Sequence, residues 1–175
     1  MHSFQIEKVT PREIEIVRSI GITTFTETFA GMNSEENMLQ YLNHAFSFEK
    51  LSDELKDKHA EFYIAYQNKT PVGYLKINLG KSQTVLKDEK ALEIERIYVL
   101  KEFHGKKIGQ LLFQKALETA ENKNVSFVWL GVWEKNDRAI GFYRKNNFVE
   151  FDKHIFKLGD DEQTDIMMKL ELNKD

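Results

Sequence analysis

Apolar side chains recur along this chain with two different periods. Spacings of three and four residues, which place side chains on one helix face, predict helices near residues 10–29, 38–46, 48–56, 108–120 and 136–147. Alternation, or a continuous β-branched and aromatic run, predicts strands near residues 4–6, 61–66, 72–79, 92–99, 125–133, 148–156 and 164–172. This order indicates one domain over residues 1–175, with a sheet of about six to seven strands flanked by helices.

Local signals mark the ends of several of these elements. Thr10-Pro11-Arg12-Glu13 is a capping box with proline in the first helical turn, so we expect a helix to begin there. Gly21 lies inside this helix and predicts a bend or a break. Between the second and third strands, Asn68-Lys69-Thr70-Pro71 predicts a hairpin turn, and residues 80–90 predict a polar loop.

The strand near residues 92–99 carries its apolar side chains on two phases. Leu92 and Ile94 share one face of an ideal strand, whereas Ile97 and Val99 fall on the other face. A slip of one residue is what a β-bulge produces, and a bulge would splay the sheet and free backbone groups for an extended ligand. A strand buried on both faces would show the same pattern, so both interpretations are kept.

A helix separates this strand from the run VSFVWLGVW near residues 125–133, which is apolar on both phases. Such a run is typical of a strand covered on both faces. Two strands joined by a helix form a βαβ unit and run parallel, whereas Gly159-Asp160-Asp161 predicts an antiparallel return between the last two strands. The fold class is therefore α/β, with a mixed (α+β) sheet.

The loop after the 92–99 strand has the composition of an anion-binding site. Its sequence, His104-Gly105-Lys106-Lys107-Ile108-Gly109, opens a helix whose first backbone amides lack partners and carry a partial positive charge. Glycine allows a phosphate to approach closely and the two lysines add full charges, so the loop predicts a pyrophosphate site. The alternative is an ordinary strand-to-helix turn, in which glycine is also common.

Composition argues against several classes of function. The net charge is −3 and the basic residues are scattered, so nucleic-acid binding is not expected. No apolar run is long enough to cross a membrane, and the N-terminus lacks a secretion signal. Cysteine is absent, which excludes disulfides and cysteine nucleophiles and fits a cytoplasmic location. The five histidines have no metal-ligand spacing, so no metal is expected.

Two motifs in order make these observations more specific. Residues 104–109 resemble the Arg/Gln-x-x-Gly-x-Gly/Ala loop of the GNAT superfamily of acetyl-CoA-dependent N-acetyltransferases, with His104 at the first position and Lys107 at the middle glycine. The family's second motif is similar to Asn136, Ala139, Phe142-Tyr143 and Asn147-Phe148, with Asn147 in place of glycine. The resemblance covers nearly the whole chain. Within the superfamily, it looks most like bacterial spermine/spermidine acetyltransferases of the PaiA type.

The resemblance implies a splayed GNAT fold, acetyl-CoA as cosubstrate, and roles for particular residues. Those expected to bind the coenzyme are Ile97, Tyr98, Val99 and Asn136 along the pantetheine arm, His104, Gly105, Lys106, Lys107, Ile108 and Gly109 at the pyrophosphate, and Lys145 at a phosphate. Lys145 is equally well interpreted as a solvated helix residue. Tyr143 would protonate the leaving thiolate, because a phenol with a pKa of about 10 stays protonated at neutral pH.

Direct attack of an amine on the thioester is the expected reaction, since the chain has no thiol for a covalent relay. An amine with a pKa of about 10.4 must first lose a proton, which costs about 4–5 kcal/mol at pH 7. Glu95 and Glu93 on the central strand are the candidate bases, and a surface location is the alternative for both. The expected acceptor is a small amine, with spermidine or spermine as the leading choice. A protein N-terminus, another small amine, a non-catalytic acyl-CoA-binding role and a homodimer are left open.

Overall fold

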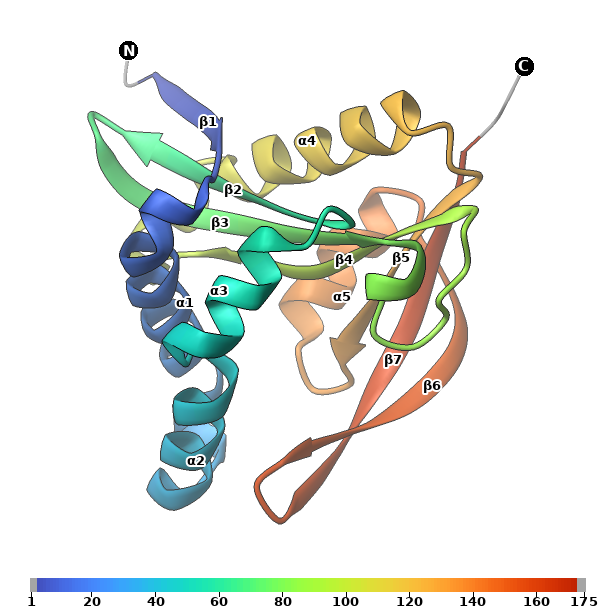
Figure 1. Ribbon diagram of the computed structural model, residues 1–175. Helices are drawn as coiled ribbons and strands as arrows, with labels where there is room; N and C mark the ends of the chain where they lie inside the picture. The colour runs from blue at the N-terminus through green and yellow to red at the C-terminus, as the bar shows by residue number, and fades with distance from the viewer. Residues whose placement is uncertain (1–2, 173–175) are drawn as a thin grey trace.

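The computed structural model describes residues 3–172, which form a mixed seven-stranded sheet with helices on both faces (Figure 1). The strands are β1 (Phe4–Lys8), β2 (Ala60–Gln67), β3 (Thr70–Leu79), β4 (Ala91–Val99), β5 (Phe127–Trp133), β6 (Val149–Leu158) and β7 (Asp161–Glu171). Their order across the sheet is β1-β2-β3-β4-β5-β7-β6. Among these described strands, neighbours run antiparallel except β4 and β5, which are parallel. The predicted fold class is confirmed.

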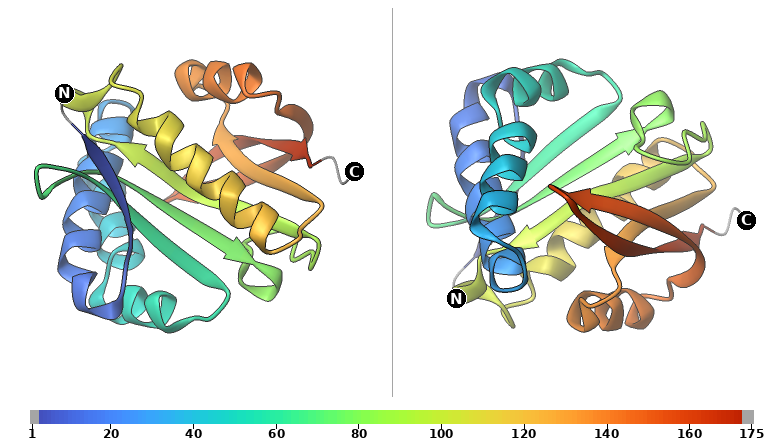
Figure 2. Two further views of the ribbon diagram at one scale, coloured as in Figure 1. Left: turned by 90° about the horizontal axis from the view of Figure 1, so that it is seen from above. Right: turned by 90° about the horizontal axis from the view of Figure 1, so that it is seen from below.

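Helices cover the two faces of the sheet as two groups. Their bounds are α1 (Ile14–Phe29), α2 (Glu35–Ala45), α3 (Phe48–Lys56), α4 (Ile108–Asn122) and α5 (Asp137–Lys145). Figure 2 shows α1–α3 on one face and α4 crossing the opposite face. Each face has its own core, with Leu112 of α4 fully buried on one side and Leu51 of α3 on the other. Burying one such side chain stabilises the fold by about 1.5–3 kcal/mol.

The irregularity predicted in the central strand is a β-bulge. Lys76 of β3 lies opposite Arg96 of β4, but Ile77 lies opposite Ile94, so Glu95 has no partner residue in this ladder. Because of the extra residue, the apolar side chains before and after Glu95 point to the same face of the sheet. Four of them therefore pack against the core beneath α4: Leu92, Ile94, Ile97 and Val99.

The sheet separates beyond this bulge, as predicted. β4 pairs with β5 only at Ala91, Leu92 and Glu93. From Leu130 onward β5 pairs with β7 alone among the described strands. The carboxyl-terminal halves of β4 and β5 are thus not hydrogen-bonded to each other, and β4 keeps backbone groups available on that side.

The predicted hairpin between β2 and β3 is confirmed, but its turn is shorter than expected, and the break expected at Gly21 is wrong. The hairpin turn between β2 and β3 contains only Asn68 and Lys69, with φ of 48° and 68°, because a two-residue turn with positive φ matches the strand twist. Gly21 does not interrupt α1. It instead makes room for Phe46, since a Cβ at Gly21 would lie 2.3 Å from the Phe46 ring. The predicted capping box is present, with the Thr10 amide donating to Glu13 at 2.7 Å.

The β6–β7 hairpin returns across the molecule towards α2. Asn37 of α2 donates a hydrogen bond of 2.8 Å to Asp160 in the turn between the two strands. This contact links the helices on one side of the separated strands to the hairpin on the other. Across residues 3–172, no helix is both long enough and apolar enough to span a membrane.

Candidate active site

Two cavities meet where β4 and β5 separate. The first, which we name the β7 cavity, has a volume of about 390 Å³ and lies between α1–α3 and the strands β4 to β7. The second, the α4 cavity, has a volume of about 360 Å³ and extends to the beginning of α4 and of α5. Both are lined by Ile97, Tyr98, Asn136, Ala139 and Tyr143. The two cavities therefore share a wall, so that two molecules bound in them would lie next to each other.

Free backbone amides lie at the beginning of α4. The amide of Leu111 is the first in this helix to meet a carbonyl, that of Lys107, at 3.1 Å. Within the described residues, no acceptor faces the amides of Ile108, Gly109 and Gln110. Gly109 lines the α4 cavity, and a side chain added there would meet nothing within 4 Å. Three unpaired amides at a helix N-terminus form a site for an anion.

The loop before α4 depends on two residues with left-handed backbone. Gly105 has φ of 80° and Lys107 has φ of 63°. For a residue other than glycine this conformation costs about 1–2 kcal/mol, which explains why glycine is favoured at such a position. Lys107 nevertheless adopts it, so the loop has the shape that glycine would give.

An imidazole and a guanidinium lie side by side in the wall of the α4 cavity. The Nε2 atom of His104 lies 2.8 Å from the carbonyl oxygen of Val99, and its Nδ1 atom contacts Nη1 of Arg138. Arg138 must donate, so Nδ1 accepts and Nε2 carries the ring proton. Arg138 was not among the coenzyme-binding residues predicted from the sequence. The available signal was its position two residues after Asn136, in the first turn of α5.

Asn136 and Tyr143 both belong to α5 or its cap. The Asn136 side-chain oxygen accepts a hydrogen bond of 3.2 Å from the Ala139 amide and caps the helix, which leaves its NH₂ group directed away from the backbone. The Tyr143 ring packs against Phe142 and Phe148, with centroids 5.4 Å and 5.5 Å away. Burial raises the pKa of Tyr143. Its phenol is therefore protonated at neutral pH.

The structure brings most, but not all, of the predicted coenzyme residues to the cavities. Ile97 and Tyr98 line both, and Val99 and His104 line the α4 cavity. The Ile108 side chain is buried in the core beneath α4, so only its backbone is available. Three predicted lysines have exposed side chains that line neither cavity: Lys106, Lys107 and Lys145.

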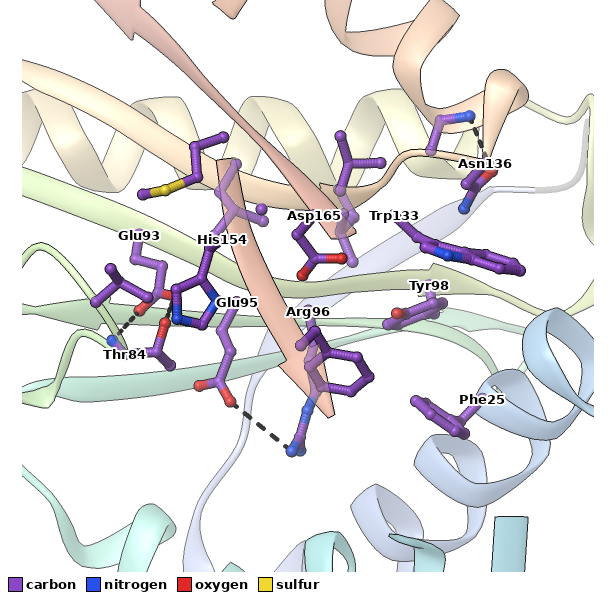
Figure 3. A pocket seen from close by; sticks show the side chains of 18 of the residues that line it. Phe25, Thr84, Glu93, Glu95, Arg96, Tyr98, Trp133, Asn136, His154 and Asp165 are labelled. Carbon is purple, nitrogen blue, oxygen red and sulfur yellow. Dashed lines mark hydrogen bonds and ion pairs between the residues drawn. The ribbon is translucent and has the colours of Figure 1, made fainter. Parts of the chain in front are cut away.

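Aromatic rings form much of the β7 cavity. Phe25 stacks on Phe29 and Tyr41, with centroids 4.4 Å and 4.3 Å away. Figure 3 shows Tyr98 and Trp133 further along the same wall, with Asp165 of β7 next to Trp133. The β4 carboxylates Glu93 and Glu95 lie towards the other end of the cavity, beyond Arg96. Such a surface attracts cations through the faces of the rings as well as through the carboxylates.

Glu95 belongs to a buried cluster of four charges. Lys76 Nζ lies 2.5 Å from Glu95 and 3.0 Å from Glu54, while Arg96 lies 3.8 Å and 4.0 Å from the same two carboxylates. Burial opposes ionisation of Glu95, but the charges of Lys76 and Arg96 outweigh it and lower its pKa to about 2. A carboxylate with so low a pKa is a weak proton acceptor at neutral pH.

Glu93 is 3% exposed and is bound to its surroundings through both oxygens. Oε2 accepts from Asn78 at 3.0 Å and from the Thr84 amide at 2.8 Å, and Oε1 contacts the Thr84 hydroxyl. Burial and the nearby Glu95 raise the pKa of Glu93, and these hydrogen bonds oppose the rise. Glu93 therefore holds the predicted 80–90 loop against β4 at the end of the β7 cavity.

Sequence reasoning missed a third carboxylate, Asp165 of β7. It lines the β7 cavity beside His154, the residue opposite it on β6. A signal was present, because Asp165 alternates with buried Met167 and Gln163 and thus places a charge on an inward strand face. Within residues 3–172, no three or more His, Cys, Asp or Glu side chains are grouped so that they could hold a metal ion.

Comparison with known proteins identifies the family. Residues 25–148 match the acetyltransferase (GNAT) family. The chain belongs to this family. An uncharacterized N-acetyltransferase of Lactobacillus delbrueckii subsp. lactis is 36% identical, over 97% of this chain and 98% of its own length. The spermidine N(1)-acetyltransferase of Thermoplasma acidophilum is 25% identical, over 83% of this chain and 88% of its own length.

Solved structures agree with this GNAT assignment. The PaiA N-acetyltransferase from Thermoplasma acidophilum, in complex with coenzyme A, has a TM-score of 0.81 and 24% identity, covering 97% of this chain and 99% of that chain. A GCN5-related N-acetyltransferase from Rhodopseudomonas palustris has a TM-score of 0.77 and 17% identity, covering 98% of both chains. The GNAT fold and the acetyltransferase activity predicted from the motifs are thus confirmed, with acetyl-CoA as the family's acetyl donor.

Proposed function

We propose that this GNAT enzyme transfers the acetyl group of acetyl-CoA to a primary amine by direct attack while both substrates are bound, and that the amine is a polyamine such as spermidine or spermine. The observation that supports this most is the wall at Tyr143 that the two cavities share. One cavity ends at free helix amides and fits the coenzyme, and the other has aromatic and acidic walls and fits an amine. Substrates in adjacent cavities react without a covalent enzyme intermediate.

In this proposal the α4 cavity holds the coenzyme. The amides of residues 108–110 bind its pyrophosphate, and Arg138 adds a positive charge close by. The backbone of Ile97 and Tyr98, which has no β5 partner, bonds the pantetheine arm as a neighbouring strand would. Asn136 donates to the same arm through its free NH₂ group. Lys145 lies outside both cavities, so in this proposal it contacts the coenzyme only at a phosphate that lies outside the α4 cavity.

Tyr143 is the proton donor to the leaving thiolate. Its ring is held by aromatic neighbours, and its burial keeps the phenol protonated. A thiolate whose conjugate acid has a pKa of about 8.5 takes the proton only if a donor lies beside it, because bulk water is displaced from the shared wall. Tyr143 therefore acts when the carbon–sulfur bond breaks.

The acceptor side favours a cationic amine of elongated shape. The β7 cavity combines aromatic rings with Glu93, Glu95 and Asp165 along its length, and a relative at 25% identity is named as a spermidine acetyltransferase. Of the two β4 carboxylates, Glu93 is the better proton acceptor, because its pKa is raised whereas that of Glu95 is lowered to about 2. Glu95 contributes mainly to the negative field that attracts the amine.

A panel of amines tests this function. Purified protein is incubated with acetyl-CoA and spermidine, spermine, a simple alkylamine or a peptide N-terminus, and free thiol is measured. Spermidine or spermine should give the highest kcat/KM. Tyr143→Phe should lower kcat by about 10²–10⁴-fold and leave coenzyme affinity unchanged. Tyr66→Phe, on a partly exposed tyrosine outside both cavities, is the matched control and should change neither value.

Two results would contradict the proposal in different ways. Absence of thiol release with every amine, while the coenzyme still binds, would favour a non-catalytic acyl-CoA-binding role. Full activity of Tyr143→Phe would remove Tyr143 from the reaction and leave the acetyltransferase activity in place.

A further inference from the structure

Asp165 differs from the other carboxylates of the β7 cavity in having neither a hydrogen-bond donor nor an ion-pair partner for its side chain among residues 3–172. It lies opposite Trp133 in the β5–β7 ladder and opposite His154 in the β6–β7 ladder. Figure 3 shows its carboxylate in the cavity, between His154 and Trp133. In the described part of the chain, no group donates a hydrogen bond to it and no cation lies within 4.0 Å. Glu93 and Glu95, by contrast, have several partners each.

A partly buried carboxylate without a partner is unfavourable, because burial removes water that nothing replaces. The neighbouring position on β5 is Gly131, where an added Cβ would lie 3.4 Å from Asp165 Oδ2. The absence of a side chain there leaves the carboxylate open to the cavity. A bound ammonium would supply the missing hydrogen bonds, and the adjacent Trp133 ring would add a cation–π contact.

From this arrangement we infer that Asp165 binds the ammonium group of the acceptor and takes its proton before attack on the thioester. This inference rests on the proposed function and names the residue that prepares the amine. Sequence reasoning placed that task on β4, whereas Asp165 lies on β7, on the far side of the same cavity.

The proton balance of the step is complete. The ammonium gives one proton to Asp165 and becomes a neutral amine, whose lone pair forms the nitrogen–carbon bond. The carbon–sulfur bond then breaks, and the thiolate takes the proton of Tyr143. The nitrogen of the new amide loses its second proton to the Tyr143 phenolate. Asp165 releases its proton to solvent, so each turnover yields one amide, one thiol and one proton.

Burial raises the pKa of Asp165 to about 6, and the charge of His154 opposes that rise. The other charged or titratable groups of this cavity, besides its tyrosines, are His44 from α2, Lys50 from α3 and Glu93, Glu95 and Arg96 from β4. The Glu95 and Arg96 charges offset each other. Asp165 therefore ionises over a range where the amine itself stays cationic. Amine binding should weaken as the pH falls through about 6.

Asp165→Asn keeps the shape of the side chain and removes its charge. Binding of spermidine is measured by calorimetry between pH 5 and 8, kcat/KM by thiol release, and the melting temperature without ligand. The variant should bind spermidine about 10–100-fold more weakly than the wild type at pH 7.5. Its affinity for spermidine should not fall further as the pH drops below 6. Asp152→Asn, on an exposed residue of β6 that lines neither cavity, is the matched control and should behave like the wild type.

The melting temperature gives a readout that does not depend on the acceptor. Since the folded pKa of Asp165 lies above its unfolded value, its ionisation destabilises the ligand-free fold above pH 6. Asp165→Asn should therefore melt at a higher temperature than the wild type at pH 7.5, and the difference should shrink as the pH falls from 6 towards 4.

Each alternative outcome separates this inference from the proposed function. An active wild type with an unchanged Asp165→Asn variant would overturn the inference alone. The inference alone is also overturned if Glu93→Gln abolishes the pH-dependent decline in spermidine affinity and Asp165→Asn does not. A wild type that binds none of the amines, together with an unchanged melting temperature in the variant, would overturn both.

Discussion

Replacing Glu95 by glutamine removes one carboxylate from a buried cluster of four charges. In the folded protein Glu95 lies 2.5 Å from the Lys76 ammonium, and Glu54 shares Lys76 and Arg96 with it. Two carboxylates thus balance two cations. After the substitution, Glu54 alone faces both. Removing one member of a buried ion pair typically costs about 3–5 kcal/mol, because it leaves an uncompensated charge away from water.

The pKa of Glu95 gives an independent magnitude. Burial alone would raise it, but Lys76 and Arg96 lower it from 4.5 to about 2. A change of this size corresponds to about 3 kcal/mol of folding free energy. The carboxyl is ionised in both states above pH 4.5, so this stability is fully present there. It is lost as the pH falls from 4.5 through about 2, where the folded protein also becomes protonated.

We therefore expect Glu95→Gln to lower the free energy of unfolding by about 3 kcal/mol at pH 7. Urea denaturation followed by circular dichroism measures this difference. Repeating it at pH 5 should give the same gap between variant and wild type, and the gap should narrow at pH 4 and again at pH 3. Glu121→Gln, on an exposed residue of α4, is the matched control. A second variant that also carries Lys76→Met leaves Glu54 with Arg96 and should recover part of the loss.

The reasoning would be refuted if Glu95→Gln lowered the free energy of unfolding by less than about 0.5 kcal/mol at pH 7, since substitutions of exposed residues have effects of that size. It would also be refuted by a gap that grows as the pH falls. Either result would show that Glu95 is free of the charge cluster and again eligible as a base.

Two further substitutions test backbone positions. Gly21→Ala should lower the free energy of unfolding by about 1–3 kcal/mol in urea denaturation, because its Cβ would lie 2.3 Å from the buried Phe46 ring. Gly31→Ala, whose Cβ would meet no described atom within 4 Å, should be neutral in the same measurement. Lys107→Gly should leave stability unchanged or raise it by up to about 1 kcal/mol, because glycine relieves the left-handed backbone. Lys106→Gly, at a residue whose φ is not positive, should leave the free energy of unfolding unchanged or lower it. A Lys106→Gly variant that is more stable than Lys107→Gly would contradict the strain argument.

The sequence alone determined features that depend on neighbouring residues. The phase slip between Ile94 and Ile97 indicated a bulge, which the β3–β4 register confirms. The capping box at Thr10 and the glycine-bearing start of α4 were visible for the same reason, since caps and turns are made by residues a few positions apart. The order of two such motifs was enough to indicate the family and, through it, the donor.

The tertiary structure decided which distant side chains meet. Lys76 and Asn78 are far from Glu95 in the sequence, yet both help to lower its pKa, so the difference between the two β4 carboxylates was invisible without the fold. Asp165 reaches the cavity because β7 inserts between β5 and β6, against the order of the chain. Strand order depends on the whole core, whereas periodicity is local. The β7 cavity, where we propose that the amine binds, is therefore the part that only the folded chain specifies.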